Sequence, residues 1–303
     1  MKKSKNVIVV EKLVKKFGKF TALDGLDLTV KKGEVHGFLG PNGSGKSTTI
    51  RIILGLLKKT SGKVSLLGHE PWGKSSELHR RLAYVPGEVN LWPNLSGGEA
   101  IDLLGDLRGG LDENKLQDLL ARFNLDPTKK FRTYSKGNRQ KVALVAALAS
   151  DVELYVLDEP TSGLDPLMEA VFQDYVNELK DQGKTVLLSS HILAEVEVLC
   201  DKVTIIREGK TVETGTLGDI QRLQRTNFSV ETKKSALPIA KLKGVHEFNE
   251  VKGRTTFEVE SKHLNDVVKK LSALQVTHVT SHPPRLEELF LRHYDKQSDN
   301  PED

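Results

Sequence analysis

Nine residues, Gly40 to Thr48, constrain the fold of this 303-residue chain more than any other stretch. They read GPNGSGKST and match G-x-x-x-x-G-K-[ST], a loop that wraps around phosphate groups. The apolar run Val35 to Leu39 before them predicts a strand, and Thr48 to Leu57 continues with apolar residues at helical spacing. The loop therefore joins a strand to a helix, as expected in an α/β sheet.

The residue types in this loop suit a phosphate site. We expect three of its glycines to adopt positive φ angles, which turn backbone N–H groups inward at a helix N-terminus. Lys46 would reach the β- and γ-phosphates of a nucleotide, and the Ser47 hydroxyl is placed to coordinate Mg²⁺. The glycines are Gly40, Gly43 and Gly45, and the whole candidate site is Gly40, Pro41, Asn42, Gly43, Ser44, Gly45, Lys46, Ser47 and Thr48.

Length and composition predict one large domain and one small one. Charged residues make up 28% of the chain and hydrophobic ones 38%, which suits a folded, soluble protein. A net charge of +4 without a long basic block gives no reason to expect a nucleic-acid surface, although it does not exclude one. The single Cys200 excludes an intramolecular disulfide and is expected to pack as a small apolar residue. No apolar run approaches about 18 residues, so no membrane span is predicted, and the N-terminus does not resemble a signal peptide.

Two further strands end in polar residues. Leu154 to Glu159 reads as a buried parallel strand, with Asp158 placed to hold Mg²⁺ and Glu159 placed to polarise a water molecule against the γ-phosphate. Paired acids also occur in helix caps, but the phosphate loop upstream favours the catalytic interpretation. Thr185 to Ser189 predicts another buried strand, and His191 after it would face the crevice where such sheets bind ligands.

The rest of the chain divides into β and helical segments. Alternating residues in Val7 to Val14 and Leu26 to Val30 predict an antiparallel β layer, and Leu91 to Leu125 predicts a helical insertion. Beyond Gly218 the pattern changes to that of a small α+β unit, with a last helix at Pro284 to His293. The predicted domains are residues 1–218, with a helical subdomain at about 90–150, an accessory domain at 219–294 and a disordered tail at 295–303.

In this order, the residues resemble the nucleotide-binding subunit of an ATP-binding-cassette (ABC) transporter. Phe17 resembles the adenine-stacking aromatic, Gly40 to Thr48 the Walker A loop, Leu154 to Glu159 the Walker B strand and His191 the switch histidine. The resemblance covers Val7 to Gly215. It implies a P-loop NTPase (RecA-like) core of α/β class, with an antiparallel β subdomain, a helical subdomain and a small C-terminal α+β domain.

Two segments compete for the family's signature motif, LSGGQ. Leu95 to Glu99 reads LSGGE and is closer in spelling, whereas Tyr134 to Gln140 begins YSKGN. The signature must begin a helix that leads into Walker B, and only the second segment does so, with its helix expected from about Asn138. We therefore assign Ser135 and Gly137 as the signature residues and interpret Ser96 with Glu99 as a capping box.

One position departs from the family pattern. Tyr84 to Glu88 aligns with the segment where the family has a glutamine that contacts Mg²⁺, and Gly87 stands at that position. Glycine has no side chain to ligate a metal, so Glu88, a water molecule or a different mode of coupling would take its place.

The resemblance also implies a mechanism and partners. ATP and Mg²⁺ would be the cofactors, and two subunits, as a homodimer or a heterodimer, would close with Ser135 and Gly137 of one capping the nucleotide of the other. A membrane permease would bind in a groove near Leu91, Trp92 and Pro93, although Trp92 suits internal packing equally well. The chain would then lie at the cytoplasmic face of the membrane. A C-terminal extension of this kind favours export over import, with an unidentified substrate.

Other functions compete with this one. ABC ATPases that act on ribosomes carry two cassettes, and this chain has one phosphate loop. Those that act on DNA insert a long coiled coil before the signature, and the interval from Leu57 to Tyr134 is too short for one. A regulatory subunit with little turnover is consistent with Gly87 but not with the complete set of catalytic residues. Phe17 would stack on guanine as readily as on adenine, so the preference for ATP rests on resemblance.

Overall fold

The computed structural model describes residues 6–73, 75–222, 225–251 and 253–282. The chain divides between Thr214 and Gly215 into two compact units, which are described separately. The helix expected at Pro284 to His293 and the tail expected at 295–303 lie outside the described residues.

A six-stranded sheet forms the centre of the first unit. Its strand order is β5-β6-β7-β3-β8-β9. The pairs β5–β6, β6–β7, β7–β3 and β3–β8 are parallel, so the carboxyl ends of these strands meet at one edge. The strands are β5 (Leu82–Val85), β6 (Leu154–Asp158), β7 (Thr185–Ser190), β3 (Val35–Leu39), β8 (Lys202–Arg207) and β9 (Lys210–Thr216).

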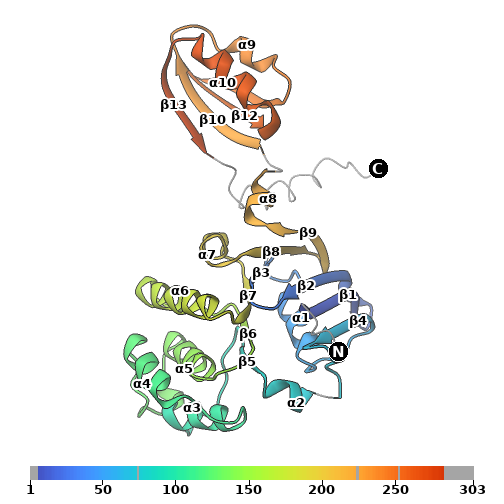
Figure 1. Cartoon of the computed structure of the whole chain (residues 1–303), viewed down its shortest axis with the longest axis vertical. Helices are drawn as coiled ribbons and strands as arrows, with labels where there is room; N and C mark the ends of the chain where they lie inside the picture. Colours follow the sequence, from blue (N-terminus) through green and yellow to red (C-terminus); the bar gives the residue numbers. More distant parts are fainter. Residues whose placement is uncertain (1–5, 74, 223–224, 252, 283–303) are drawn as a thin grey trace. The chain divides into compact units, whose positions relative to one another are not determined.

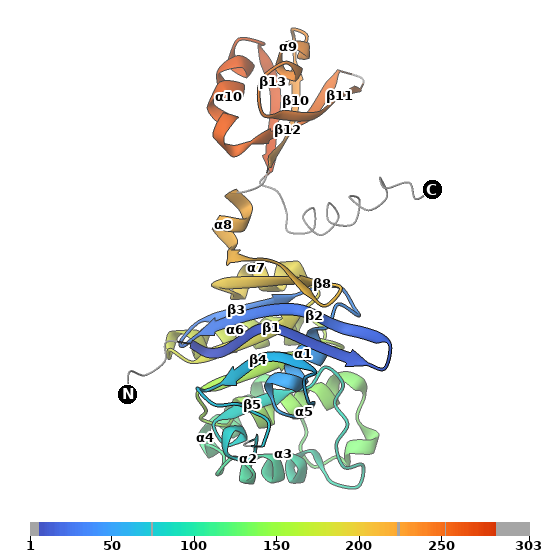
Figure 2. The same ribbon diagram turned by 90° about the vertical axis from the view of Figure 1, so that its right-hand side faces the viewer.

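The strands β3, β6 and β7 are buried along their whole lengths and are mainly apolar, as expected for parallel strands covered on both faces. One face is covered by the first helix and by a second sheet, of order β2-β1-β4, which Figure 2 shows from its outer side. The antiparallel pairing of β1 with β2 confirms the predicted β layer, and β4 extends it. These elements are β1 (Asn6–Phe17), β2 (Phe20–Lys31), β4 (Ser61–Leu66) and α1 (Lys46–Ile53).

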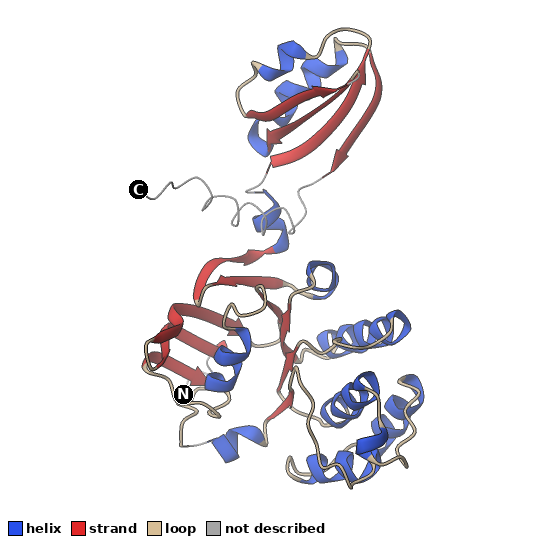
Figure 3. Ribbon diagram, turned by 180° about the vertical axis from the view of Figure 1, so that it is seen from behind, coloured by secondary structure: helices blue, strands red, loops and turns tan. Residues whose placement is uncertain are grey.

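Helices cover the opposite face of the central sheet (Figures 1 and 3). They include the helical insertion, in which the predicted capping box is confirmed: Ser96 and Glu99 exchange side-chain and backbone hydrogen bonds at the start of α3. The next long helix, predicted from about Asn138, begins two residues earlier, at Lys136, because the Ser135 hydroxyl accepts the Asn138 N–H and caps it. These helices are α3 (Gly97–Asp106), α4 (Glu113–Arg122), η1 (Phe131–Thr133), α5 (Lys136–Leu148), α6 (Pro166–Asp181) and α7 (Leu193–Leu199). The short α2 (Ser75–His79) lies on the side of α1 instead, where the His79 ring is 2.7 Å from the Leu54 carbonyl oxygen (Figure 1).

The second unit packs two helices against one face of a four-stranded antiparallel sheet of order β11-β12-β10-β13 (Figure 3). Its core contains Phe228 and Phe257, whose rings stack with centroids 5.4 Å apart, together with Val267 and Leu271 of a helix. This small core is separate from that of the first unit. The elements are α8 (Leu217–Arg222), β10 (Arg225–Thr232), α9 (Leu237–Ala240), β11 (Val245–Val251), β12 (Arg254–Glu260), η2 (Ser261–His263), α10 (Leu264–Ser272) and β13 (Val276–His282).

Candidate functional site

The loop after β3 forms the floor of the site. Gly43 and Gly45 have positive φ angles of 81° and 106°, as expected for a backbone that turns its N–H groups inward. The same expectation for Gly40 is wrong, because its φ is not positive. A side chain is excluded there by space instead: an added Cβ would crowd the Ser44 hydroxyl and lie 2.6 Å from the Ile206 carbonyl oxygen.

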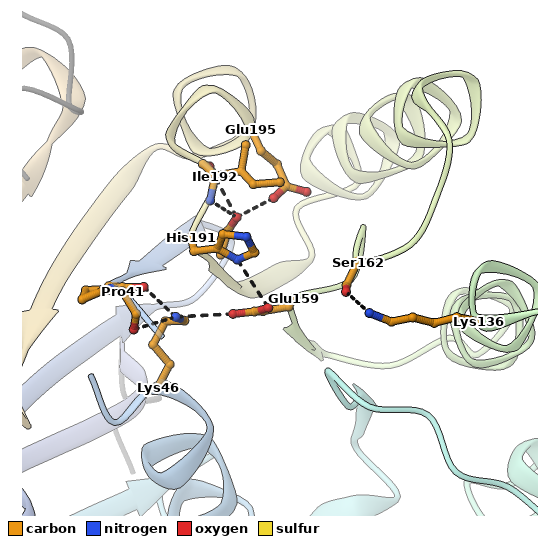
Figure 4. A network of polar contacts seen from close by, with 10 residues as sticks. Pro41, Lys46, Lys136, Glu159, Ser162, His191, Ile192 and Glu195 are labelled. Atoms are coloured by element: carbon orange, nitrogen blue, oxygen red, sulfur yellow. Dashed lines mark hydrogen bonds and ion pairs between the residues drawn. The ribbon is translucent and has the colours of Figure 1, made fainter. Parts of the chain in front are cut away.

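Lys46, at the start of α1, is buried and folds back over the loop. Its Nζ donates to the carbonyl oxygens of Gly40 at 2.6 Å and Pro41 at 3.3 Å. It also lies 3.4 Å from Glu159 Oε1 (Figure 4). A buried ammonium group needs such partners, since burying a lone charge is very costly. The predicted phosphate-binding lysine and the predicted catalytic carboxylate are therefore in contact.

Glu159 connects the ends of three strands. Its backbone N–H donates to the Ser189 carbonyl of β7 at 2.9 Å, and its Oε2 lies 3.3 Å from His191 Nδ1. Its φ of 49° is in the left-handed region, which costs about 1–2 kcal/mol for a residue with a Cβ. This strained turn directs the carboxylate between Lys46 and His191, as Figure 4 shows.

Asp158 precedes Glu159 at the end of β6 and is buried, with its Oδ1 atom lacking any hydrogen-bond partner among the described residues. An unsatisfied carboxylate oxygen suits a cation or a cation-bound water, so the residues present fit Mg²⁺. Gly87 lies against it: an added Cβ would be 3.3 Å from the Asp158 carbonyl oxygen and 3.8 Å from its carboxylate. Burial, and secondarily the Asp158 charge, raises the pKa of Tyr84 to about 12.

A cavity of about 310 Å³ extends from the loop to the tip of the β1–β2 hairpin. Phe17 lines it, and so does Phe20, its cross-strand partner, which the sequence analysis missed. The signal was present in the sequence as two aromatic residues that flank a Gly-Lys turn. The cavity is lined by Phe17, Phe20, Ala22, Pro41, Asn42, Gly43, Gly45, Lys46, Ser47, Thr48 and Glu159.

Ser135 and Gly137 do not line this cavity; they lie in the first turn of α5. Gly137 packs so closely on the Gly163 carbonyl oxygen that a Cβ there would be nearer than the 3.0 Å that real Cβ atoms keep. Lys136 Nζ donates to Ser162 Oγ at 2.9 Å (Figure 4). The start of α5 is therefore tied to the loop that follows Glu159 in the same chain.

A second cavity, of about 600 Å³, lies between α1 and the helical insertion. Glu88 lines this cavity and not the one around the phosphate loop. Leu91 lines it as well, while Trp92 is 46% exposed and therefore incompletely packed. Arg108 is a half-buried cation in its wall, and desolvation lowers the pKa of its guanidinium to about 10.

Comparison with known proteins identifies the family. Residues 23–162 match the family model described as ABC transporter, and residues 215–294 match the C-terminal domain of DrrA1-3-like ATP-binding proteins. The linearmycin resistance ATP-binding protein LnrL of Bacillus subtilis is 32% identical over 302 residues, covering 94% of this chain and 97% of LnrL. The chain belongs to the ATP-binding proteins of ABC transporters.

Other relatives of this ABC protein agree. The daunorubicin resistance ATP-binding protein DrrA3 of Streptomyces coeruleorubidus is 36% identical over 219 residues, covering 71% of this chain and 69% of DrrA3. A dimeric structure of the cassette MJ0796 bound to ADP and Pi superimposes with a TM-score of 0.62 at 26% identity, covering 69% of this chain and 98% of that one.

The predicted family, fold class and ATPase activity are confirmed. As a member of the family, the protein is an ATP-binding and ATP-hydrolysing subunit that dimerises and works with membrane permease components. Among the described residues, no helix combines the length and apolar character needed to span a membrane.

Proposed function

We propose that this ABC ATPase powers the export of an antimicrobial compound through a separate permease, from the cytoplasmic face of the membrane. Two similarities support export. LnrL and DrrA3, which are named for resistance to linearmycin and daunorubicin, match this chain, and the second unit matches the DrrA-type C-terminal domain. The match to LnrL covers 94% of this chain, so it includes the second unit as well as the cassette.

The proposed mechanism depends on two contacts of Glu159, one with Lys46 and one with His191. Lys46 binds the β- and γ-phosphates, Glu159 accepts a proton from the attacking water, and His191 holds that water and the γ-phosphate. The Ser47 hydroxyl and the Asp158 carboxylate would hold Mg²⁺. When bound, the ion neutralises charge on the phosphates. The side chain of Phe17 stacks on the base of ATP.

Closure of a dimer completes this proposed site. Ser135 and Gly137 of the partner subunit would face the γ-phosphate, where the N-terminus of α5 favours negative charge. Within each subunit, Lys136 at the start of α5 is bonded to Ser162. Movement of the start of α5 would therefore be transmitted to the loop after Glu159 of the same subunit.

The permease would contact the 600 Å³ cavity. Its wall is largely apolar, with Leu91, Leu104 and Leu107 on one side, and Leu107 is 64% exposed. An amphipathic cytoplasmic segment of the permease would bury these side chains at about 25 cal/mol for each Å² removed from water.

Replacement of Glu159 by Gln tests the assigned base. The variant should lose at least about 100-fold in ATP turnover, the usual contribution of a general base, while it still binds ATP. Light scattering after gel filtration should then detect a dimer in MgATP and a monomer in MgADP. Glu197→Gln, at an exposed glutamate on α7, is the matched control. Full turnover in Glu159→Gln would show that the base is misassigned.

Purification of the tagged chain from detergent-solubilised cells tests the transport role. A polytopic membrane protein should co-purify, and less of it should be recovered with Leu107→Asp, because the aspartate places a charge in an apolar contact. Recovery of ribosomes in place of a membrane protein would contradict the proposal and favour a ribosome-acting ATPase.

A further inference from the structure

Glu195 is a buried carboxylate that the proposed mechanism does not use. It lies on α7, only 5% exposed, between the buried apolar residues Leu193 and Val196. Its Oε1 atom has no hydrogen-bond partner among the described residues. A carboxyl group in such a position destabilises the fold relative to an apolar side chain of similar size. Stability therefore gives no reason for a glutamate at this position.

The other oxygen of Glu195 holds the turn that carries His191. Ser190 Oγ donates to Glu195 Oε2 at 2.7 Å, and the Ile192 N–H donates to the same Ser190 oxygen at 2.9 Å (Figure 4). The residues immediately before and after His191 are thus held by one hydroxyl, and that hydroxyl is oriented by Glu195.

The His191 side chain depends on this turn for its direction. It is 47% exposed, and its Nδ1 atom lies 3.3 Å from Glu159 Oε2. Because this imidazole is half exposed and has one close polar contact among those described, the conformation of its backbone mainly sets the direction of its side chain. Movement of the turn would therefore separate His191 from Glu159.

Glu195 also faces the segment after Glu159. The Thr161 hydroxyl, two residues beyond Glu159, lies close enough to its carboxyl group to lower the pKa of that group. Burial raises the pKa of Glu195, and Glu169 acts in the same direction. The hydroxyls of Ser190 and Thr161, together with the nearby His191, act in the opposite direction. One carboxyl group is therefore bonded to the loop of His191 and lies close to the loop that follows Glu159.

We propose that Glu195 is a positioning residue for ATP hydrolysis, which acts through the Ser190 hydroxyl to hold His191 against Glu159 and the γ-phosphate. The inference rests on the catalytic roles proposed above for Glu159 and His191. Glu195 itself does not line the nucleotide cavity. Its effect should therefore be on turnover and not on the binding of ATP.

Steady-state ATPase assays of the full chain test this proposal. Glu195→Leu should fold, since its neighbours are apolar, and should lower kcat about tenfold while KM for ATP stays within about twofold. Ser190→Ala, a second and smaller change, should have the same effect. Glu195→Gln should keep most of kcat, because its amide oxygen can still accept the Ser190 hydroxyl. Glu197→Leu, at the exposed glutamate on the same helix, is the matched control and should match wild type.

A second set of variants separates positioning from a general structural effect. In a His191→Ala background, Glu195→Leu should lower kcat no further, because the side chain that it positions is gone. An equal loss in both backgrounds, or wild-type kcat in Glu195→Leu and Ser190→Ala, would overturn the inference and leave the proposed function intact. Wild-type kcat in His191→Ala would instead remove the proposed role of His191, and with it the role of Glu195.

Discussion

Two glycine substitutions distinguish the two candidate signature motifs. Gly137 belongs to the motif assigned at the start of α5, and Gly98 belongs to Leu95 to Glu99, the segment closer to LSGGQ in spelling. An added Cβ at Gly137 would be nearer than 3.0 Å to the Gly163 carbonyl oxygen, whereas one at Gly98 would be an ordinary 3.4 Å from Pro127. We expect Gly137→Ala to impair ATP hydrolysis and Gly98→Ala to leave it unchanged.

The size of the effect follows from this geometry. To reach the 3.4 Å of an ordinary contact from under 3.0 Å, α5 and the loop at Gly163 must separate by at least 0.4 Å (3.4 − 3.0). Overpacking of this kind costs about 1–3 kcal/mol, partly offset by about 1 kcal/mol from the higher helix propensity of alanine. A misplacement approaching 1 Å in a catalytic site lowers the rate about 100-fold, so we expect a 10- to 100-fold loss of kcat.

ATPase assays and urea unfolding of both variants provide the measurement. Gly137→Ala should lose up to about 2 kcal/mol of unfolding free energy and most of its turnover, and Gly98→Ala should match wild type in both. Loss of activity in Gly98→Ala with normal turnover in Gly137→Ala would show that Leu95 to Glu99 is the true signature and would refute the positional argument.

Two further predictions concern the aromatic residues of the nucleotide cavity and the raised pKa of Tyr84. Phe17→Ala and Phe20→Ala should each raise the Kd for ATP about tenfold, because stacking of a base on an aromatic ring contributes about 1–3 kcal/mol. Calorimetric titration with ATP measures this Kd. An unchanged Kd in either variant would exclude that ring from binding the base. Since the pKa of Tyr84 is raised to about 12, its neutral phenol stabilises the fold below pH 10, and this contribution is lost as the pH rises from 10 to 12. Urea unfolding should therefore show wild type losing about 1.4 kcal/mol relative to Tyr84→Phe between pH 9 and pH 11, and parallel stability curves would contradict that origin of the shift.

The sequence was sufficient for features that depend on local pattern. Continuous apolar runs identify β3, β6 and β7, because parallel strands covered on both faces tolerate little else. The Ser96–Glu99 box forms as predicted, because both of its hydrogen bonds lie within one turn of helix. Since the parallel strands end at one edge, the polar residues that follow β3, β6 and β7 come together, and Lys46, Glu159 and His191 do so.

Features set by tertiary contact could not be predicted in this way. Gly40 has no room for a side chain because of Ile206, which is 166 residues away and comes beside it only when β8 pairs with β3. Glu88 is adjacent to Gly87 in sequence but lines the second cavity, since the chain there passes from β5 toward the helical insertion. The sequence analysis did not single out Glu195, because only its burial and its contact with Ser190 distinguish it from the exposed Glu197 on the same helix.

The contacts of Glu159 indicate how nucleotide binding and hydrolysis would be linked under the proposed mechanism. Its carboxylate lies 3.4 Å from Lys46, so in this arrangement it balances the charge that a triphosphate would otherwise balance. Triphosphate oxygens carry more negative charge than one carboxylate and would become the partners of Lys46, which would leave His191 as the remaining side chain beside the Glu159 carboxylate. The carboxylate would then be available to accept a proton only when nucleotide is bound. The proposed catalytic base is thus paired with the phosphate-binding lysine and becomes able to activate water only when ATP replaces it as the partner of that lysine.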